Sequence, residues 1–199
     1  MTPRPDVSEA RKNQILDAAL QVFARRGFHK ARMDDIAQEA GLSKGALYWY
    51  FRSKDALIES LVDKLFTWEI RNLERLASSH DRPVPDRLRE LSRNVLKSLD
   101  RWKPVLPVLY EFYALATRPG PVRNALQGYY RRYLATLTKL IAEGVARGEL
   151  RAVDPDMTAM TLIVQFEGLM LLWVIDPETF NFPTQWLPMS EYFIASIEA

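Results

Sequence analysis

Residues 37–50, which read Ala-Gln-Glu-Ala-Gly-Leu-Ser-Lys-Gly-Ala-Leu-Tyr-Trp-Tyr, constrain the fold more than any other part of the chain. Gly41 can adopt the left-handed conformation that ends a helix, and Ser43 can cap the helix that follows. Ala37 is small enough to let a second helix pack closely. Two short helices joined by so tight a turn predict a helix-turn-helix, whose second helix enters the major groove of DNA.

The second helix of this corner is expected over residues 44–50, with two different sides. Leu47 and Tyr50 are spaced to point back at the first helix of the corner. The outer side carries Lys44, Gly45, Tyr48 and Trp49. A basic and aromatic outer surface suits contact with a nucleic acid.

Positive charge is concentrated at the start of the chain. Residues 1–54 contain ten Lys or Arg against six Asp or Glu (+4), and residues 55–199 contain seventeen against nineteen (−2), within a total of +2. The hydrophobic fraction of 48% with 26% charged residues is typical of a globular chain. This layout is typical of a nucleic-acid-binding end carried by a near-neutral body.

Helical spacing of apolar residues runs through the chain, and strand alternation is almost absent. We expect an all-α protein of about nine helices: a three-helix DNA-binding domain over residues 1–54, then a larger helical domain for effector binding and dimerisation over residues 55–199. The expected helices are a first one capped by Asp6 or Ser8 and ended by Gly27, then 32–40, 44–50, 54–78, 86–102, a bent helix after Pro104 and Pro107, 122–147, 156–175 and 187–197.

The helix expected over residues 156–175 resembles a membrane span in length. Residues 157–175 contain a single charge, Glu167. A span usually needs about 20 apolar residues, and a central acid costs roughly 2.5–3.5 kcal/mol on insertion scales. Acids rather than basic anchors flank the segment, namely Asp154, Asp156 and Asp176. We therefore expect a buried helix of a soluble protein and no membrane partner.

The same helix is apolar on two opposite sides. One side contains Leu162, Phe166, Leu169 and Trp173, and the other contains Met160, Val164, Gly168, Leu171 and Ile175. A helix that is apolar all round must be covered all round. We expect the first side to face the core of the protomer. The second is then a dimer interface, an isologous contact completed by the last helix of the chain.

No group of residues supports catalysis. The chain has no Cys, which excludes disulfides, thiolate nucleophiles and cysteine-based zinc sites and fits a reducing cytoplasm. His29 and His80 are isolated, without a carboxylate at metal-ligand spacing. Glycine-rich phosphate loops and nucleophile elbows are also absent. We expect no enzymatic activity, no cofactor, no metal and a cytoplasmic location.

Two stretches carry a family resemblance: Ile15-Leu16-Asp17-Ala18-Ala19 with Phe23 and Gly27-Phe28, and the unbroken run from Met33 to Leu57. Together they resemble the TetR/AcrR family of bacterial one-component transcriptional regulators. The similarity covers about residues 9–60, and beyond them only the overall helical pattern is similar. The resemblance implies a homodimer that binds a palindromic operator on double-stranded DNA. It also implies a small-molecule effector that moves the fourth helix, and repression more often than activation.

The resemblance places the DNA contacts on the recognition helix and at neighbouring helix starts. The candidates are Lys44, Gly45, Tyr48, Trp49, Tyr50, Lys54, Arg32 and Met33. Tyr50 also suits the core, and Trp49 suits either the groove or packing against the fourth helix. The chain departs from the family at Ala31 and Arg32, where many members have Thr or Ser. A lost cap costs about 1 kcal/mol, although Arg32 can offer a charge to phosphate instead.

Aromatic residues of the larger domain exceed what a compact core requires, so some are expected to line a pocket for a small apolar or aromatic effector. The candidates are Trp68, Trp102, Tyr110, Tyr113, Tyr129, Tyr133 and Phe166, with Glu167 as a polar anchor or as the partner of a Tyr or Arg. Glu111 is a second candidate anchor. Aromatic residues at helical spacing also suit an ordinary core.

Three alternatives stay open at this point. The protein could be a helical ligand-binding protein whose DNA end is inactive, which salt-dependent operator binding would exclude. An enzyme on the same scaffold would turn over a bound compound. Within the family, activation is the alternative to repression.

Overall fold

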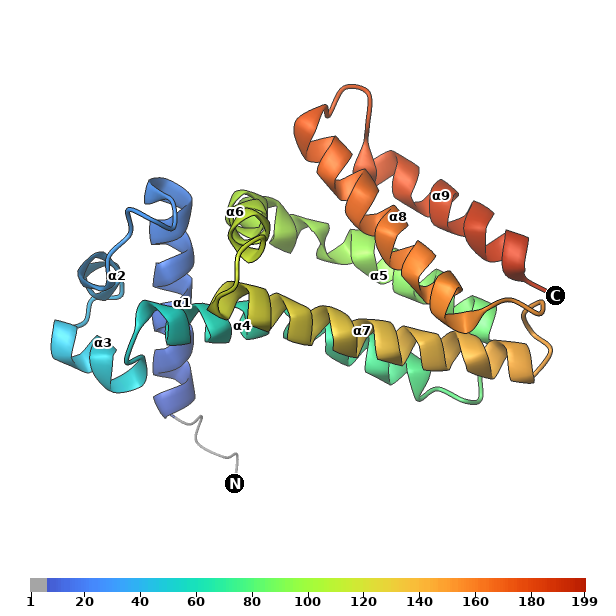
Figure 1. Cartoon of the computed structure of the whole chain (residues 1–199), viewed down its shortest axis with the longest axis horizontal. Helices are drawn as coiled ribbons and strands as arrows, with labels where there is room; N and C mark the ends of the chain where they lie inside the picture. Colours follow the sequence, from blue (N-terminus) through green and yellow to red (C-terminus); the bar gives the residue numbers. More distant parts are fainter. Residues whose placement is uncertain (1–6) are drawn as a thin grey trace. The chain divides into compact units, whose positions relative to one another are not determined.

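The computed structural model describes residues 7–199, and every regular element in this range is a helix (Figure 1). The elements are α1 (Val7–Arg26), α2 (Met33–Glu39), α3 (Lys44–Tyr50), α4 (Lys54–Ala77), α5 (Val84–Trp102), the 3₁₀ turn η1 (Lys103–Val105), α6 (Leu106–Ala116), α7 (Pro121–Ala146), α8 (Pro155–Ile175) and α9 (Phe182–Ile197). The expected all-α fold with an N-terminal helix-turn-helix is confirmed. The proposed cap Asp6 lies outside the described residues.

Local chemistry accounts for most helix boundaries. Asp154 caps α8 by accepting hydrogen bonds from the N–H groups of Asp156 at 2.9 Å and Met157 at 3.1 Å. Pro155 follows as the first helical residue, where its missing N–H has no cost. The two prolines after α5 lie at the first turns of η1 and of α6, where a proline is tolerated, so they separate α5 from α6.

The last helix begins earlier than predicted, at Phe182 instead of Leu187. Asn181 supplies the cap, because its side-chain oxygen accepts a hydrogen bond from the Thr184 N–H at 3.1 Å. Phe182 and Trp186, expected in a loop, are buried and stack with ring centroids 5.6 Å apart. Burial of these two rings extends α9 by a turn at its start, and Pro188 lies inside the helix.

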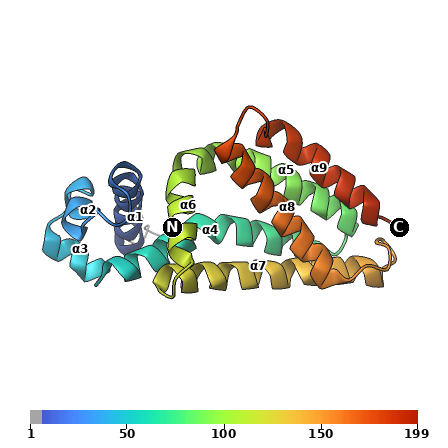
Figure 2. The ribbon, with the colours of Figure 1, turned by 45° about the horizontal axis from the view of Figure 1, so that its top comes forward.

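The chain forms two compact units. The first contains the described residues up to Phe66 together with Arg101–Tyr129, and the second contains Thr67–Asp100 and Tyr130–Ala199. In the first unit, Figure 2 shows α2 beside α1 and α3 beside α2. Ile15, Ala19 and Phe23, spaced along one side of α1, are buried in the core of this unit.

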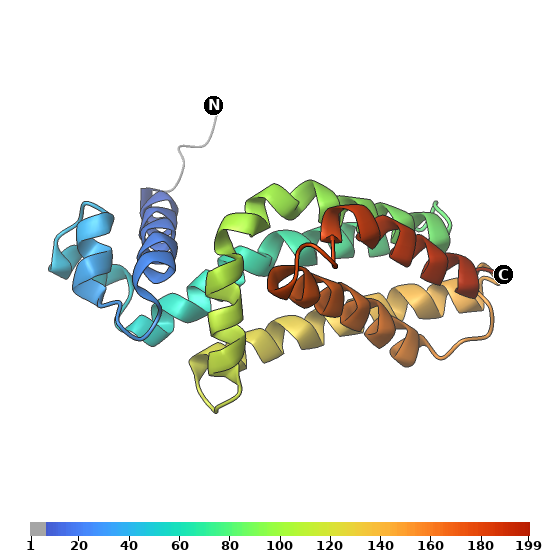
Figure 3. The ribbon, with the colours of Figure 1, turned by 90° about the horizontal axis from the view of Figure 1, so that it is seen from above.

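The second unit has its own apolar core. Buried residues from α4, α5, α7, α8 and α9 form one cluster that includes Leu73, Leu88, Ile141, Leu162 and Ile194. Helices α8 and α9 lie side by side in all three ribbon views (Figures 1–3). The side of α8 that was expected to face the core does so, because Leu162 and Leu169 are buried.

A buried ion pair also lies within the second unit. The side chain of Arg87 on α5 is fully buried, and its Nη2 lies 2.5 Å from Glu143 Oε1 on α7. Its Nη1 donates to the backbone carbonyl of Ala77 at 3.1 Å. This arrangement holds the pKa of Glu143 at about 2, with smaller contributions from hydrogen bonds to His80 and Arg147.

Candidate nucleic-acid interface

The corner between α2 and α3 has the geometry that the sequence predicts. Gly41 has φ +64°, which few residues other than glycine adopt easily, and it ends α2. The N–H of Leu42 donates to Ala37 O at 2.9 Å and that of Gly41 to Gln38 O at 3.0 Å, the Schellman pattern of a helix end. Ser43 caps α3 by accepting from the Ala46 N–H at 3.2 Å.

The inner side of α3 is held by a small core. Leu47 is fully buried, and so is Ile36 on α2. The side-chain amide of Gln14 on α1 donates to Ala40 O at 2.7 Å, which satisfies a carbonyl at the end of α2. Two helices of seven residues each are too short to be stable alone, so α1 fixes their positions.

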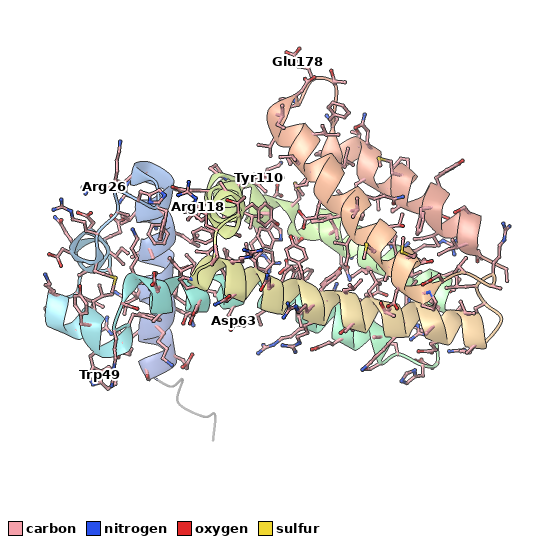
Figure 4. The ribbon with its side chains drawn as sticks, viewed as in Figure 1. Arg26, Trp49, Asp63, Tyr110, Arg118 and Glu178 are labelled. Carbon is pink, nitrogen blue, oxygen red and sulfur yellow. The ribbon has the colours of Figure 1, made fainter. Side chains whose placement is uncertain are left out.

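The outer side of α3 leaves aromatic rings exposed. Trp49 is 74% exposed and Tyr48 is 39% exposed. Figure 4 shows Trp49 projecting away from α3, so the alternative in which it packs against the fourth helix is wrong. Tyr50 is half-buried, with its ring 4.6 Å from that of Trp49.

Acidic residues of α2 partly neutralise the basic surface. Lys44 Nζ lies 3.0 Å from Asp34 Oδ1, and this hydrogen bond raises the pKa of Lys44. Arg26, labelled in Figure 4, lies 2.7 Å from Asp35, and Arg25 pairs with Glu39. These are exposed pairs, each with at least one side chain more than half accessible, so a phosphate can compete for the cations.

Two predicted DNA contacts have internal positions instead. Met33 is only 8% exposed, because it packs in the small core beneath α2. Lys54 donates through Nζ to the backbone carbonyls of Phe28 and Ala31, the second at 2.8 Å. Its ammonium also lies 3.9 Å from the centroid of the Phe28 ring. The ammonium therefore binds carbonyls within the unit, and partial burial lowers the pKa of Lys54.

Arg32 stands at the start of α2 with an exposed side chain. It has no oxygen with which to cap the helix, but its own N–H donates to Asp35 Oδ2 at 3.0 Å. Asp35 thus supplies the reciprocal half of a capping box, which reduces the expected cost of losing Thr or Ser here. Arg52, which is not among the candidates from the sequence, is exposed just beyond α3 and has no ion pair within residues 7–199. A basic residue directly after a recognition helix was the available signal.

The candidate effector residues fall in both units. In the first unit Trp102 and Tyr129 pack on Phe66, at centroid distances of 5.2 and 4.1 Å, and Tyr110 lies 5.6 Å from Tyr113. Two cavities are described, of about 510 Å³ in the first unit and 570 Å³ in the second. The candidate anchor Glu111 lines the first of them, whereas the predicted aromatic pocket residues line neither.

In the second unit, Glu167 has the tyrosine partner that was one of its two expected roles. Tyr130 donates to Glu167 Oε1 at 2.5 Å. Burial, together with the nearby carboxylates of Glu69 and Glu167, raises the pKa of Tyr133. Phe166 packs edge-on against Phe182 at 5.7 Å and Trp186 at 5.6 Å, inside an aromatic cluster, whereas Trp68 is 39% exposed.

The predicted dimer surface of α8 is accessible in the single chain. Its large members Met160, Val164, Leu171 and Ile175 are between 43% and 69% exposed, and Gly168 is half-buried. The 570 Å³ cavity is a groove that continues this surface between α8 and α9, and its lining includes Val164, Gly168 and Met189. By length and composition α8 could also cross a membrane, with a mean hydropathy of 1.7 over its most apolar window.

Both the N-terminal and the C-terminal part of the chain match the sequence profile of a known protein family. The profile of the tetR family of bacterial regulatory proteins matches residues 15–61, and that of the C-terminal domain of BetI-type transcriptional repressors matches residues 83–197. The HTH-type transcriptional regulator TtgR of Pseudomonas putida is 28% identical over 171 residues, which cover 83% of this chain and 81% of TtgR.

Solved structures share the fold. SmeT of Stenotrophomonas maltophilia in complex with triclosan has a TM-score of 0.82 at 21% identity and covers 96% of this chain and 92% of its own. FadR of Bacillus subtilis in complex with stearoyl-CoA has a TM-score of 0.75 at 21% identity, with 92% and 95% covered. The resemblance found in residues 9–60 thus extends into the larger domain, and the chain belongs to the TetR family of bacterial transcriptional regulators.

Proposed function

We propose that the protein is a repressor that binds a palindromic operator as a homodimer and is released by a small apolar or aromatic effector. The observation that carries this proposal is the outer side of α3, where Tyr48 and Trp49 are exposed beside Lys44 and Gly45. A monomeric chain gains nothing from leaving these rings in water, whereas a groove of DNA can accept them.

We assign DNA recognition to residues 1–54, and effector binding and dimerisation to residues 55–199. Tyr48 is suited to a phosphate through its hydroxyl or to a thymine methyl through its ring, and Lys44 to a guanine edge or a phosphate. A Cβ added at Gly45 would meet no protein atom within 4 Å. The protein's own packing therefore does not require glycine there, but close approach of the backbone to DNA would.

Cationic contacts to the DNA backbone complete the proposed interface. Arg32 and Arg52 have exposed side chains at the start of α2 and just after α3. Lys44 would exchange its carboxylate partner, Asp34, for a phosphate. Each exchange releases counterions from the DNA, so we expect operator binding to weaken steeply with salt.

The homodimer is proposed to form through the exposed apolar side of α8 together with α9. A Cβ at Gly168 would meet nothing within 4 Å, so the space beside this residue is open to a partner helix. A twofold axis would pair the same surface on both protomers and place two copies of α3 about 34 Å apart, in successive major grooves. Burial between subunits would account for the apolar residues along α8.

The effector is proposed to bind among the aromatic side chains of residues 55–199. Two proteins with this fold have been solved in complex with triclosan and with stearoyl-CoA, and each of these ligands has an aromatic or aliphatic apolar part. Trp102, Tyr110, Tyr113 and Tyr129 are the candidates in the first unit, and each packs against another aromatic ring. An effector that prefers a different spacing of the two recognition helices would release the operator, in proportion to its difference in affinity for the two states.

A selection experiment tests this proposal. A random double-stranded DNA library is incubated with the purified protein, and the retained sequences are determined. We expect enrichment of a palindrome whose half-sites are centred about 10 base pairs, or a multiple of that, apart. Retention of random sequences, or binding that is insensitive to salt, would instead favour a ligand-binding protein with an inactive DNA end.

A further inference from the structure

The turn that joins α1 to α2, residues 27–31, is held by a carboxylate from a distant helix. Gly27 has φ +73° and directs the chain away from α1. The next N–H group, that of Phe28, lies beyond the helix end and has no partner there. Glu111 on α6 provides one, because its Oε1 accepts from this N–H at 2.7 Å.

The carboxylate is in close contact with the backbone of the turn. A Cβ added at Gly27 would lie 3.4 Å from Glu111 Oε1, in van der Waals contact with the carboxylate. The neighbouring Phe112 is fully buried, and its ring lies 6.2 Å from Phe23 and 6.3 Å from Phe28, edge-on to each. Helix α6 therefore holds the turn by one hydrogen bond and one aromatic cluster.

The start of α4 holds the same turn through Lys54. Its ammonium donates to the carbonyls of Phe28 and Ala31, at the two ends of the segment that leads into α2. Burial lowers the pKa of Lys54, and the negative charge of Glu111 opposes this effect. The carboxylate therefore stabilises the charged form of Lys54. The turn thus has one charged partner from α6 and one from α4.

Glu111 has room to move away from the turn. It borders the 510 Å³ cavity in the first unit, whose lining also includes Arg118 and Arg123. Figure 4 shows Arg118 near the end of α6. The carboxylate therefore borders open space, and the same cavity is lined by two guanidiniums that are chemically suited to pair with a carboxylate.

We infer that Glu111 is a positioning residue for DNA recognition: its hydrogen bond to the Phe28 N–H couples the orientation of α2 and α3 to the position of α6. The inference rests on the proposed function, because it assumes that α3 contacts DNA. It goes beyond that function by identifying the residue through which α6, outside residues 1–54, would influence the recognition helix.

Two substitutions of Glu111 distinguish the effect of side-chain length from the effect of negative charge. Glu111→Gln keeps an oxygen at the same distance but loses the charge. Glu111→Asp keeps the charge but is shorter by one carbon–carbon bond, roughly 1.5 Å, so it cannot reach the N–H. Glu59→Gln, at an exposed position of α4, controls for removing an acid near DNA.

Affinities are measured on the operator that wild-type protein selects. We expect Glu111→Asp to weaken operator binding about tenfold, because an unsatisfied N–H favours other conformations of the turn. Glu111→Gln and Glu59→Gln should stay within about threefold of wild type. Amide hydrogen exchange at Phe28 should accelerate about tenfold in Glu111→Asp only, with exchange at Ile15 unchanged.

The outcomes are distinct. Equal operator affinity of wild type and Glu111→Asp would overturn the coupling, and so would a loss in Glu111→Gln as large as that in Glu111→Asp. Unchanged exchange at Phe28 would show that the hydrogen bond does not hold the turn and would also overturn it. Failure of the wild-type protein to select any operator would refute the proposed function itself, whatever the exchange at Phe28.

Discussion

Helices α3 and α8 both expose large apolar side chains, but they expose them in different surroundings. Trp49 on α3 is 74% accessible and Ile175 on α8 is 69% accessible, so exposure alone does not distinguish the two surfaces. Around Trp49 the outer residues are Lys44, Gly45 and a tyrosine, whereas the exposed side of α8 is apolar throughout. The first surface suits a polyanion with apolar base edges, and the second suits a surface like itself.

The ion pairs near α3 and inside the second unit also differ, because the first are exposed and the second is buried. Lys44 and Asp34 form a pair in which both side chains are more than half exposed, so the lysine can exchange partners. Arg87 is fully buried against Glu143, and such a pair cannot exchange without leaving a charge unpaired. Charges near α3 are available to a ligand, whereas those inside the second unit hold its helices together.

The largest effect should follow from placing charge on the α8 surface. In Val164→Asp/Leu171→Asp two acids per protomer would be buried in the proposed interface. We expect the dimer dissociation constant to rise on the order of 100-fold or more, as measured by sedimentation equilibrium. Ala135→Asp, on the exposed side of α7, is the control and should leave the dimer intact. A double variant that stays dimeric would show that α8 is not the interface.

The next largest effect concerns the buried ion pair. Glu143→Gln leaves the Arg87 guanidinium without a counter-charge and should lower the free energy of unfolding by about 3 kcal/mol, measured by urea denaturation. An exposed acid such as Glu178 provides the matched control, Glu178→Gln, which should change stability little. Equal stability of the two variants would contradict the structural role of the pair.

The same pair predicts how stability depends on pH. The pKa of Glu143 is about 2 in the folded protein against an ordinary 4.5, so its contribution is complete above pH 4.5 and is lost as the pH falls toward 2. The slope of stability against pH in this range should therefore be smaller in Glu143→Gln than in the wild type. An unchanged slope would mean that other carboxylates cause the pH dependence of stability in this range.

A smaller effect is expected at the recognition helix. Tyr48→Ala should weaken operator binding about 10- to 100-fold, as expected for one lost base contact, and nonspecific DNA binding much less. Fluorescence anisotropy on both duplexes measures the difference. Equal losses of affinity for the operator and for nonspecific DNA would indicate that Tyr48 contacts the phosphate backbone. No loss of affinity for either duplex would show that Tyr48 does not contact DNA.

The smallest effect is expected at Lys44. Lys44→Met should reduce the slope of log affinity against log salt by about 1, on any DNA sequence, because one phosphate contact is lost. Asp34→Asn frees the same lysine and should bind DNA at least as tightly as wild type. A loss in Asp34→Asn comparable to that in Lys44→Met would mean that the ion pair stabilises the corner instead.

Elements whose signals lie close together in the sequence form where they are predicted. Gly41, Ser43 and Leu47 lie within seven residues, and each has a physical requirement that its neighbours meet, so α3 begins and ends where expected. The same is true of the cap and proline at the start of α8. In α9 the Asn181 cap was also local but was overlooked, which displaced the expected start by a turn.

Contacts between residues that are far apart in the chain could not be predicted from the sequence. Lys54 binds carbonyls 23 and 26 residues away, and Glu111 binds an N–H 83 residues away, distances at which periodicity carries no information. A half-buried acid within an apolar helix needs a donor, so a tyrosine or arginine partner for Glu167 was foreseeable, but not that Tyr130 supplies it. Likewise, the number of aromatic residues in the larger domain predicts that a pocket exists but not which residues line it.

The most direct test of the account is the stoichiometry of the complex with one selected operator duplex, measured by native mass spectrometry. If the apolar side of α8 pairs two protomers so that two copies of α3 contact one palindrome, the complex contains two protomers, and Val164→Asp/Leu171→Asp gives mostly free DNA. A single protomer bound with full affinity to the whole palindrome would contradict the account.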